Sequence, residues 1–223
     1  MSSFYQGDLS TKSGRRRAWL HGFFADHAFF RVFWSNFAVV KPGVLYRANQ
    51  PTPAKLRTLA REYGLKTLIN LRGETKYGSA ALSRYTARAL GLDFYDMAFE
   101  SRGAPHKDRI LRLAGIYAGM QPPALIHCKS GADRAGLAAG LFLLLEGGTA
   151  EDALAQLSLR FGHIRQSSTG ILDAFFRLYQ LAAEGKKPFL DWVREDYDEA
   201  ALRSAFKAGR IAEFFNATML RRE

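Results

Sequence analysis

The sequence contains one cysteine, Cys128, and the residue types around it suit nucleophilic attack on an anion. Five residues separate Cys128 from Arg134. A thiol attacks phosphorus only as a thiolate, so its pKa must fall from about 8.5 into the range of about 3.5–7.5. A loop between a strand and a helix lowers the pKa because its backbone N–H groups converge on one point, where the helix N-terminus adds positive partial charge. The spacing therefore predicts a reactive thiolate rather than an inert, buried thiol.

The residues between Cys128 and Arg134 also suit a phosphate-binding loop. The same N–H groups can surround a tetrahedral anion, and the guanidinium of Arg134 can hold two of its oxygens at once. Gly131 supplies the backbone freedom that such a tight loop needs. We interpret Cys128 as the nucleophile and Arg134 as the phosphate clamp. The predicted phosphate-binding residues are Lys129, Ser130, Gly131, Ala132, Asp133 and Arg134.

The segment HCKSGADR resembles the H-C-x5-R signature loop of the protein tyrosine and dual-specificity phosphatases. Two earlier segments, Tyr46–Pro51 and Leu68–Arg72, resemble the first strands of atypical dual-specificity phosphatases from bacteria, fungi and plants. The resemblance implies a two-step reaction. The cysteine forms a phosphocysteine while an acid protonates the leaving oxygen, and water then hydrolyses the intermediate. The resemblance also implies that His127 tunes the thiolate through hydrogen bonding.

Several acidic residues are candidates for the general acid. Asp133 directly precedes the loop arginine, as in a subgroup of the superfamily where this Asp is a proposed acid. Its alternative role is to orient that arginine. Asp96 lies 32 residues before the nucleophile, roughly where the superfamily carries its mobile acid loop, and Glu100 and Asp108 lie in the same region. We rank Asp133 first and Asp96 second.

One residue departs from the family pattern. Most members place Ser or Thr directly after the loop arginine, where the hydroxyl helps the thiolate leave the phosphocysteine, and this chain has Ala135. The departure predicts slow breakdown of the intermediate, or breakdown aided in another way. It also leaves open a second class of function, a phosphate-binding module that does not turn over.

The substrate is expected to be anionic. Lys129 adds a cation to the loop, as in phosphatases that act on inositides. A basic cluster of Arg160, His163 and Arg165 either faces the pocket or lies in a solvated loop. The expected partners are a phosphotyrosine or other phosphoprotein, an inositol phosphate or a lipid head group. We expect no cofactor and no metal, since no zinc-ligand spacing built on paired cysteines is present.

The charge balance favours anionic partners in general. The formal net charge is +11, from 32 Lys and Arg against 21 Asp and Glu. Such a surface attracts phosphorylated molecules, acidic membranes or nucleic acid. No nucleic-acid-binding motif is evident, so nucleic acid is not expected as a partner. A single free thiol suits a reducing compartment, which predicts a cytoplasmic location.

The N-terminal residues 1–40 form a basic, aromatic-rich arm. Arg15-Arg16-Arg17 precede an apolar stretch from Ala18 to Val40, which polar residues interrupt at about helical spacing. The interruptions and the lack of a cleavage site argue against a signal peptide or a membrane span. We expect a helix in this stretch. It either packs on the domain or lies on an acidic membrane, which would make the protein peripheral to the inner face of a membrane.

Alternating strands and helices predict an α/β fold with a central, mostly parallel sheet flanked by helices, of the protein tyrosine phosphatase type. The phosphatase domain is expected over residues 41–185, followed by a helical extension over 186–223. The predicted strands are Val44–Tyr46, Lys66–Leu71, Gly91–Phe99 and Ala124–Ile126. The predicted helices run from Thr52 to Tyr63, Ser79 to Leu90, Ile110 to Tyr117, Ala135 to Leu145, Thr149 to about Leu159, Leu172 to Tyr179 and Leu202 to Phe215.

Overall fold

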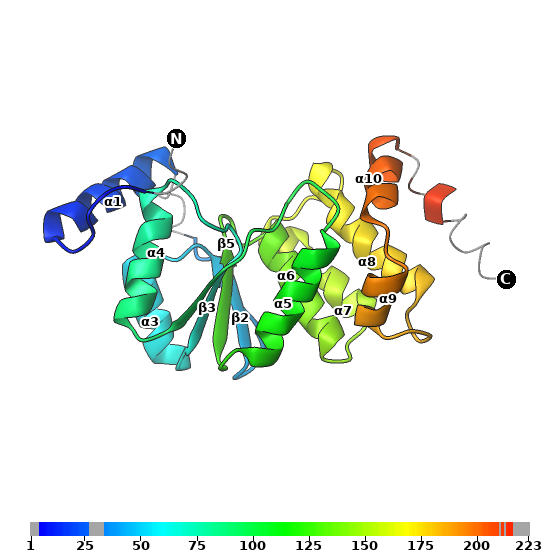
Figure 1. Ribbon diagram of the computed structural model, residues 1–223, viewed down its shortest axis with the longest axis horizontal. Coiled ribbons are helices and arrows are strands. Elements are labelled where there is room, and N and C mark those ends of the chain that lie inside the picture. The colour runs from blue at the N-terminus through cyan, green and yellow to red at the C-terminus, as the bar shows by residue number, and fades with distance from the viewer. Residues whose placement is uncertain (1–4, 27–33, 210, 212, 216–223) are drawn as a thin grey trace. The chain divides into compact units, whose positions relative to one another are not determined.

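The computed structural model describes residues 5–26, 34–209, 211 and 213–215 (Figure 1). The chain divides into two compact units. The first contains residues 1–98 and 120–131, and the second contains residues 99–119 and 132–223. No helix in the described part of the chain is long and apolar enough to cross a membrane. The division into an arm, a phosphatase domain and a C-terminal extension stays a prediction.

A five-stranded sheet forms the centre of the first unit. Its order is β1-β2-β5-β3-β4. The strands are β1 (Ala38–Lys41), β2 (Leu45–Asn49), β3 (Thr67–Asn70), β4 (Asp93–Asp96) and β5 (Ala124–Cys128). Only β1 is antiparallel to its neighbour. The mostly parallel α/β sheet that the sequence predicts is confirmed.

The register places the candidate nucleophile at the carboxyl edge of this sheet. Asn49 of β2 pairs with Cys128 of β5, and Asn70 of β3 pairs with His127. Every residue of β2 and β5 is buried. The carboxyl edge of a parallel sheet is where α/β proteins usually bind ligands.

Helices α3 (Pro53–Tyr63) and α4 (Gly78–Ala89) pack on one face of the sheet (Figure 1). The hydroxyl of Thr52 accepts a hydrogen bond from the N–H of Lys55, and Pro53 occupies the first turn of α3. Gly64 ends α3 with a φ of +63°. These local signals account for the close agreement between the predicted and observed bounds of α3. The apolar contact with the sheet is made by Leu56, Leu59, Leu65 and Ala87 against Tyr46, Ala48, Leu68 and Leu125.

The N-terminal arm differs from the prediction. Helix α1 (Lys12–Ala25) begins before the expected apolar stretch, ends at Ala25 and packs on α4. Val40 lies in β1, because the edge of β2 offers hydrogen-bond partners that extended backbone can use. The predicted helix from Ala18 to Val40 was therefore wrong at its C-terminal end. Residues 27–33, which include part of this prediction, lie outside the described residues.

Helices make up most of the second unit. They are α5 (Lys107–Gly119), α6 (Asp133–Leu145), α7 (Ala150–Ala155), α8 (Ile171–Ala182), α9 (Phe189–Glu195) and α10 (Glu199–Lys207). Helix α6 is buried along most of its length, as its apolar sequence predicts. Helix α7 ends four residues earlier than expected, and Leu159–Phe161 form a short 3-10 turn.

An aromatic cluster holds α9 against α8 within this unit. The ring of Phe175 lies 5.7 Å from that of Trp192 and 5.0 Å from that of Tyr197. The hydroxyl of Tyr197 donates to the carbonyl of Pro105 at 2.8 Å. Trp192 is fully buried, so α9 is an integral part of this unit. Helix α10 begins before the predicted start at Leu202 and ends at Lys207.

Candidate active site

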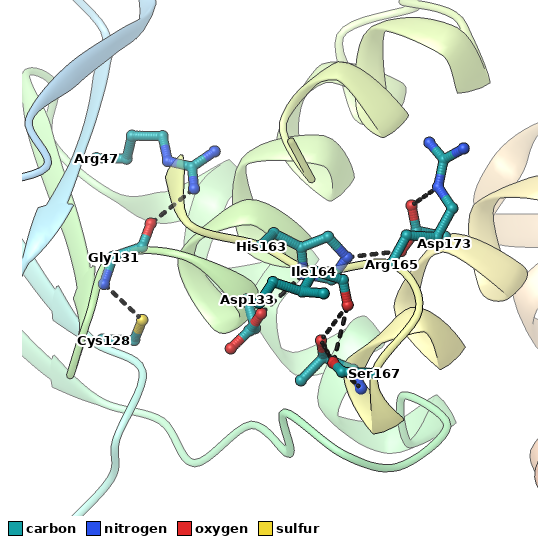
Figure 2. Close-up of polar contacts among 10 residues, drawn as sticks. Arg47, Cys128, Gly131, Asp133, His163, Ile164, Arg165, Ser167 and Asp173 are labelled. Carbon is teal, nitrogen blue, oxygen red and sulfur yellow. Dashed lines mark hydrogen bonds and ion pairs between the residues drawn. The ribbon is translucent and has the colours of Figure 1, made fainter. Parts of the chain in front are cut away.

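Cys128 is the last residue of β5 and is buried. The N–H of Gly131 donates a hydrogen bond to its Sγ at 3.2 Å (Figure 2). This hydrogen bond fixes the sulfur against the backbone of the loop that leads to Arg134.

Residues outside the loop hold its backbone carbonyls. The side chain of Asn36 donates to the carbonyl of Ser130 at 2.9 Å. The guanidinium of Arg47 donates to the carbonyl of Gly131 at 2.7 Å (Figure 2). In a trans peptide the carbonyl and the next N–H point to opposite sides. Anchoring the carbonyl of Ser130 therefore turns the next N–H, that of Gly131, toward the sulfur.

Gly131 is the one position in this loop where a side chain would not fit. Its φ is +78°, and a Cβ atom there would lie 2.6 Å from the backbone nitrogen of Asn49. Both the left-handed backbone and the close approach to β2 require glycine. The prediction that Gly131 supplies a tight turn agrees with this geometry.

Lys129 contacts an acidic residue of the N-terminal arm. Its Nζ lies 3.4 Å from Oδ1 of Asp26, which directly follows α1 and is fully buried. Asp26 also receives two hydrogen bonds from Arg72, at 2.6 and 2.8 Å, and one from the hydroxyl of Ser79 at 2.7 Å. A buried carboxylate with a bidentate guanidinium partner is strongly held. Asp26 therefore connects the arm, the end of β3 and the loop.

In the second unit, Asp133 opens α6 and binds His163. Oδ1 of Asp133 lies 2.7 Å from Nδ1 of His163, and Nε2 of His163 lies 2.6 Å from Oδ2 of Asp173 (Figure 2). The other oxygen of Asp173 accepts from Nε of Arg165 at 2.9 Å. His163 and Asp173 are both buried. The alternative of a solvated loop is thus wrong for His163, because its imidazole bridges two carboxylates.

The two carboxylates determine the charge of His163. Burial opposes a charge on the ring, but the hydrogen bonds and attraction from Asp133 and Asp173 more than offset it and raise the pKa of His163 to about 9. The imidazole is therefore protonated at neutral pH and donates to both carboxylates. Asp133 and His163 form an ion pair at the start of the helix that carries Arg134.

The other acid candidates have different surroundings. Asp96 ends β4 and accepts a hydrogen bond from Asn70 at 2.7 Å, and it also forms a close ion pair with Arg84. Its carboxylate is thus held within the sheet and by α4. In the second unit Glu100 pairs closely with Arg109, and Asp108 lies exposed in the first turn of α5.

The remaining predicted site residues lie in β5, in the loop after it and at the start of α6. His127 is buried within β5, and its carbonyl accepts from the N–H of Leu71. Ser130 is exposed, Ala132 is buried and directly precedes α6, and Arg134 is half-buried in its first turn. The tuning role of His127 stays a prediction. Among the described residues, no three His, Cys, Asp or Glu side chains are grouped so that they could hold a metal ion.

Sequence reasoning missed four residues that support the site. They are Asn36, Arg47, Asp26 and Asp173. Three of them lie far from their loop partners along the chain; for example, Arg47 is 84 residues from Gly131, and Asn36 is 94 residues from Ser130. The only sequence signal was polar side chains inside otherwise apolar segments. Arg47 in the buried strand β2 is the clearest case, because a buried charge must have partners.

Solved structures with the same kind of fold are known. Pseudomonas aeruginosa TpbA is 18% identical, with 78% of this chain and 91% of TpbA covered and a TM-score of 0.53. The core catalytic domain of the PP-IP phosphatase SIW14 from S. cerevisiae is 20% identical, with 79% and 94% covered and a TM-score of 0.50. No curated protein matches the sequence. At such low identity these similarities show the fold, which is that of the dual-specificity-like phosphatases.

The family is shown by the sequence itself. Residues 36–169, more than half of the chain, match a family model described as DSP-PTPase phosphatase fused to NAD+ kinase. The matched range includes both the loop from Cys128 to Arg134 and His163. The chain therefore belongs to the DSP-PTPase family of cysteine-dependent phosphatases.

Proposed function

We propose that the chain hydrolyses phosphomonoesters through a phosphocysteine, with Cys128 as the nucleophile and Arg134 as the phosphate clamp. The hydrogen bond from the N–H of Gly131 to Sγ of Cys128 is the observation that supports this most directly. The sulfur attacks phosphorus while the bond to the leaving oxygen breaks, and that oxygen takes a proton. Water then attacks phosphorus, breaks the S–P bond and releases phosphate.

The test is hydrolysis of p-nitrophenyl phosphate by the wild type, Cys128→Ser and Arg134→Lys. Both variants should lose activity, because the first lacks the thiolate and the second lacks the bidentate fork. Arg160→Lys is the matched control, since Arg160 is exposed and lies outside the loop. Activity retained by Cys128→Ser would remove Cys128 from the mechanism.

For the general acid we propose Asp133 acting together with His163. The protonated ring of His163 faces Oδ1 of Asp133 through Nδ1, so the pair has a proton to give at neutral pH. Asp96 is less suited, because Arg84 and Asn70 both engage its carboxylate. The acid passes its proton to the leaving oxygen in the first step and is reprotonated from the attacking water in the second.

Leaving-group dependence separates the two acids. Loss of the acid should slow phenyl phosphate, whose leaving group needs a proton, far more than p-nitrophenyl phosphate, whose leaving group is stable as an anion. We expect Asp133→Asn to show this selective loss and Asp96→Asn to slow both substrates by the same factor. The opposite pattern would move the acid to Asp96.

For the substrate we propose phosphotyrosine or another phosphoprotein before the highly anionic phosphates. The cations that suggested inositol or lipid phosphates have acidic partners: Lys129 lies beside Asp26, and Arg165 pairs with Asp173. A cation that is already paired with a carboxylate attracts a polyanionic substrate less strongly than an unpaired one. Among proteins of similar fold, TpbA has been solved in complex with pTyr. The test of this order of substrate preference is to compare kcat/KM across a panel of phosphotyrosine peptides, inositol polyphosphates and phosphoinositides.

Ala135 supports a second candidate, a phosphate-binding module with little or no turnover. It is fully buried in α6, where a hydroxyl-bearing residue is usual in this family. If neither the wild type nor Cys128→Ser hydrolyses p-nitrophenyl phosphate, yet inorganic phosphate raises the melting temperature of both, the module is the correct function. Rapid mixing that detects trapped phosphocysteine in the wild type would instead support a slow enzyme.

A further inference from the structure

Helix α1 packs on the first unit through its smallest residues. Ala18 and Gly22 are its buried positions, and they lie against the start of α4. A Cβ atom on Gly22 would stand 2.9 Å from Cβ of Ser79, and one on Gly78 would stand 2.2 Å from the carbonyl of Ala18. The two helices therefore approach closely through small residues, with His21 and Arg15 contacting α4 beside them and Phe24 left exposed.

The outward side of α1 carries large apolar side chains. Phe24 is 69% exposed, Trp19 is 40% exposed and Leu20 is 39% exposed. The ring of Trp19 stacks on Phe23 at 4.8 Å, so the exposed rings form one cluster. A helix on a globular domain normally turns such residues inward. An exposed apolar cluster of this kind marks an interaction surface.

The charge of α1 indicates the partner. Its first half contains Lys12, Arg15, Arg16 and Arg17, and the helix has no acidic residue. Cations and aromatic residues are thus separated along the helix axis, with the basic half first. Beside it lies a hollow lined by Arg15, Arg16, Trp19 and Arg57 among others, and none of its lining residues is acidic.

We propose that α1 docks the protein on an acidic phospholipid surface. The aromatic half would enter the boundary between head groups and acyl chains. The exposed Arg16 and Arg17 would contact the phosphates, since Arg15 already donates to the carbonyls of Leu9 and Ser10. A second copy of the chain fits poorly, because two helices with four cations each repel one another. Nucleic acid would satisfy the arginines but would leave Phe24 and Leu20 in water. Of these three partners, an acidic lipid surface is the one that suits both the basic half and the aromatic half of α1.

The experiment is co-sedimentation of the full chain with vesicles of phosphatidylcholine alone and of phosphatidylcholine mixed with phosphatidylglycerol. The wild type should bind the acidic vesicles and not the neutral ones. Arg16→Glu combined with Arg17→Glu should weaken partitioning at least ~30-fold, since each cation near an anionic surface contributes about a factor of five to ten. Lys186→Glu combined with Lys207→Glu is the matched control: both residues are exposed in the second unit, and the change in net charge is the same.

A second pair of variants tests the apolar half. Trp19→Ser combined with Phe24→Ser should abolish binding, while Leu159→Ser, which removes an even more exposed apolar side chain in the second unit, should leave it unchanged. All variants should retain hydrolysis of p-nitrophenyl phosphate, which shows that they fold. Equal loss in both charge-reversal variants would mean attraction by net charge alone and would overturn the proposal. Self-association that disappears in Trp19→Ser/Phe24→Ser, without vesicle binding by the wild type, would also overturn it in favour of a second copy.

Discussion

Replacing His163 by Gln tests whether the bridge between Asp133 and Asp173 contributes to stability as an ion pair. In the folded chain the pKa of His163 is about 9, against 6.5 for an ordinary histidine. The full difference would correspond to a ceiling of about 3.4 kcal/mol at low pH, at 1.36 kcal/mol per pKa unit. Water reaches Asp133, whose side chain is 23% exposed, and screens part of this attraction. We therefore expect a loss of about 1–2 kcal/mol in the unfolding free energy at pH 7.

The pH dependence gives the sharper result. A histidine whose pKa is raised on folding stabilises the fold fully below its unfolded pKa of 6.5, and this contribution is lost as pH rises through about 9. Urea denaturation of the wild type and His163→Gln between pH 6 and pH 10 should give curves that differ most at pH 6 and converge toward pH 10. Because both proteins share every other titrating group, the difference isolates His163.

His106→Gln is the matched control for this series. His106 also contacts two carboxylates, Glu199 at 3.1 Å and Glu100 at 3.5 Å, but about a third of its side chain is exposed. Exposed pairs contribute little, so His106→Gln should cost under about 1 kcal/mol. A difference between wild type and His163→Gln that stays constant or grows from pH 6 to pH 10 would refute the ion-pair reasoning.

Three further substitutions have defined outcomes. Asp26→Asn should lower the unfolding free energy, measured by urea denaturation, by ~3–5 kcal/mol, because it leaves the buried guanidinium of Arg72 uncompensated. The control Asp93→Asn, at an exposed site, should change the unfolding free energy little. Gly131→Ala should abolish hydrolysis of p-nitrophenyl phosphate, and Gly147→Ala, with a similar φ of +83° but open space around it, should only lower the melting temperature; equal activity in both would remove the close approach as the cause. Ala135→Ser should raise kcat and shorten the lifetime of the trapped phosphocysteine, while Ala138→Ser, one turn further along α6, should do neither. An unchanged lifetime in Ala135→Ser would mean that the missing hydroxyl does not limit breakdown of the intermediate.

Local signals in the sequence predicted the bounds of α3, α4 and α6 closely. The Thr52 cap and Pro53 place the start of α3, and the reciprocal hydrogen bonds of Thr149 and Asp152 form a capping box at the start of α7. These interactions span three residues, so the sequence contains all the information that they need. The same holds for the loop from Cys128 to Arg134, whose pattern predicted the family that the family model matches.

Interactions between distant segments could not be predicted in this way. Strand β1 forms because the edge of β2 is available, and the aromatic stretch before it suggested a helix instead. The ion pair of Asp26 with Arg72 joins residues 46 positions apart. Nothing in the sequence near Asp26 distinguishes a buried carboxylate from one on the polar side of a helix. Tertiary contact decides such cases, and a single sequence does not record it.

The dependence of the loop on distant residues follows from the chemistry that it must perform. A loop that turns an N–H group toward a cysteine sulfur turns the preceding carbonyl the other way, and carbonyls turned away in this manner need donors. Asn36 and Arg47 supply donors to two of them, and the backbone N–H of Gln50 supplies one to the carbonyl of Lys129. A C-x5-R pattern without such donors would not keep its amides directed at the sulfur. Arg47, fully buried in β2, is therefore a second sequence signal of such a loop, because a buried guanidinium must find acceptors.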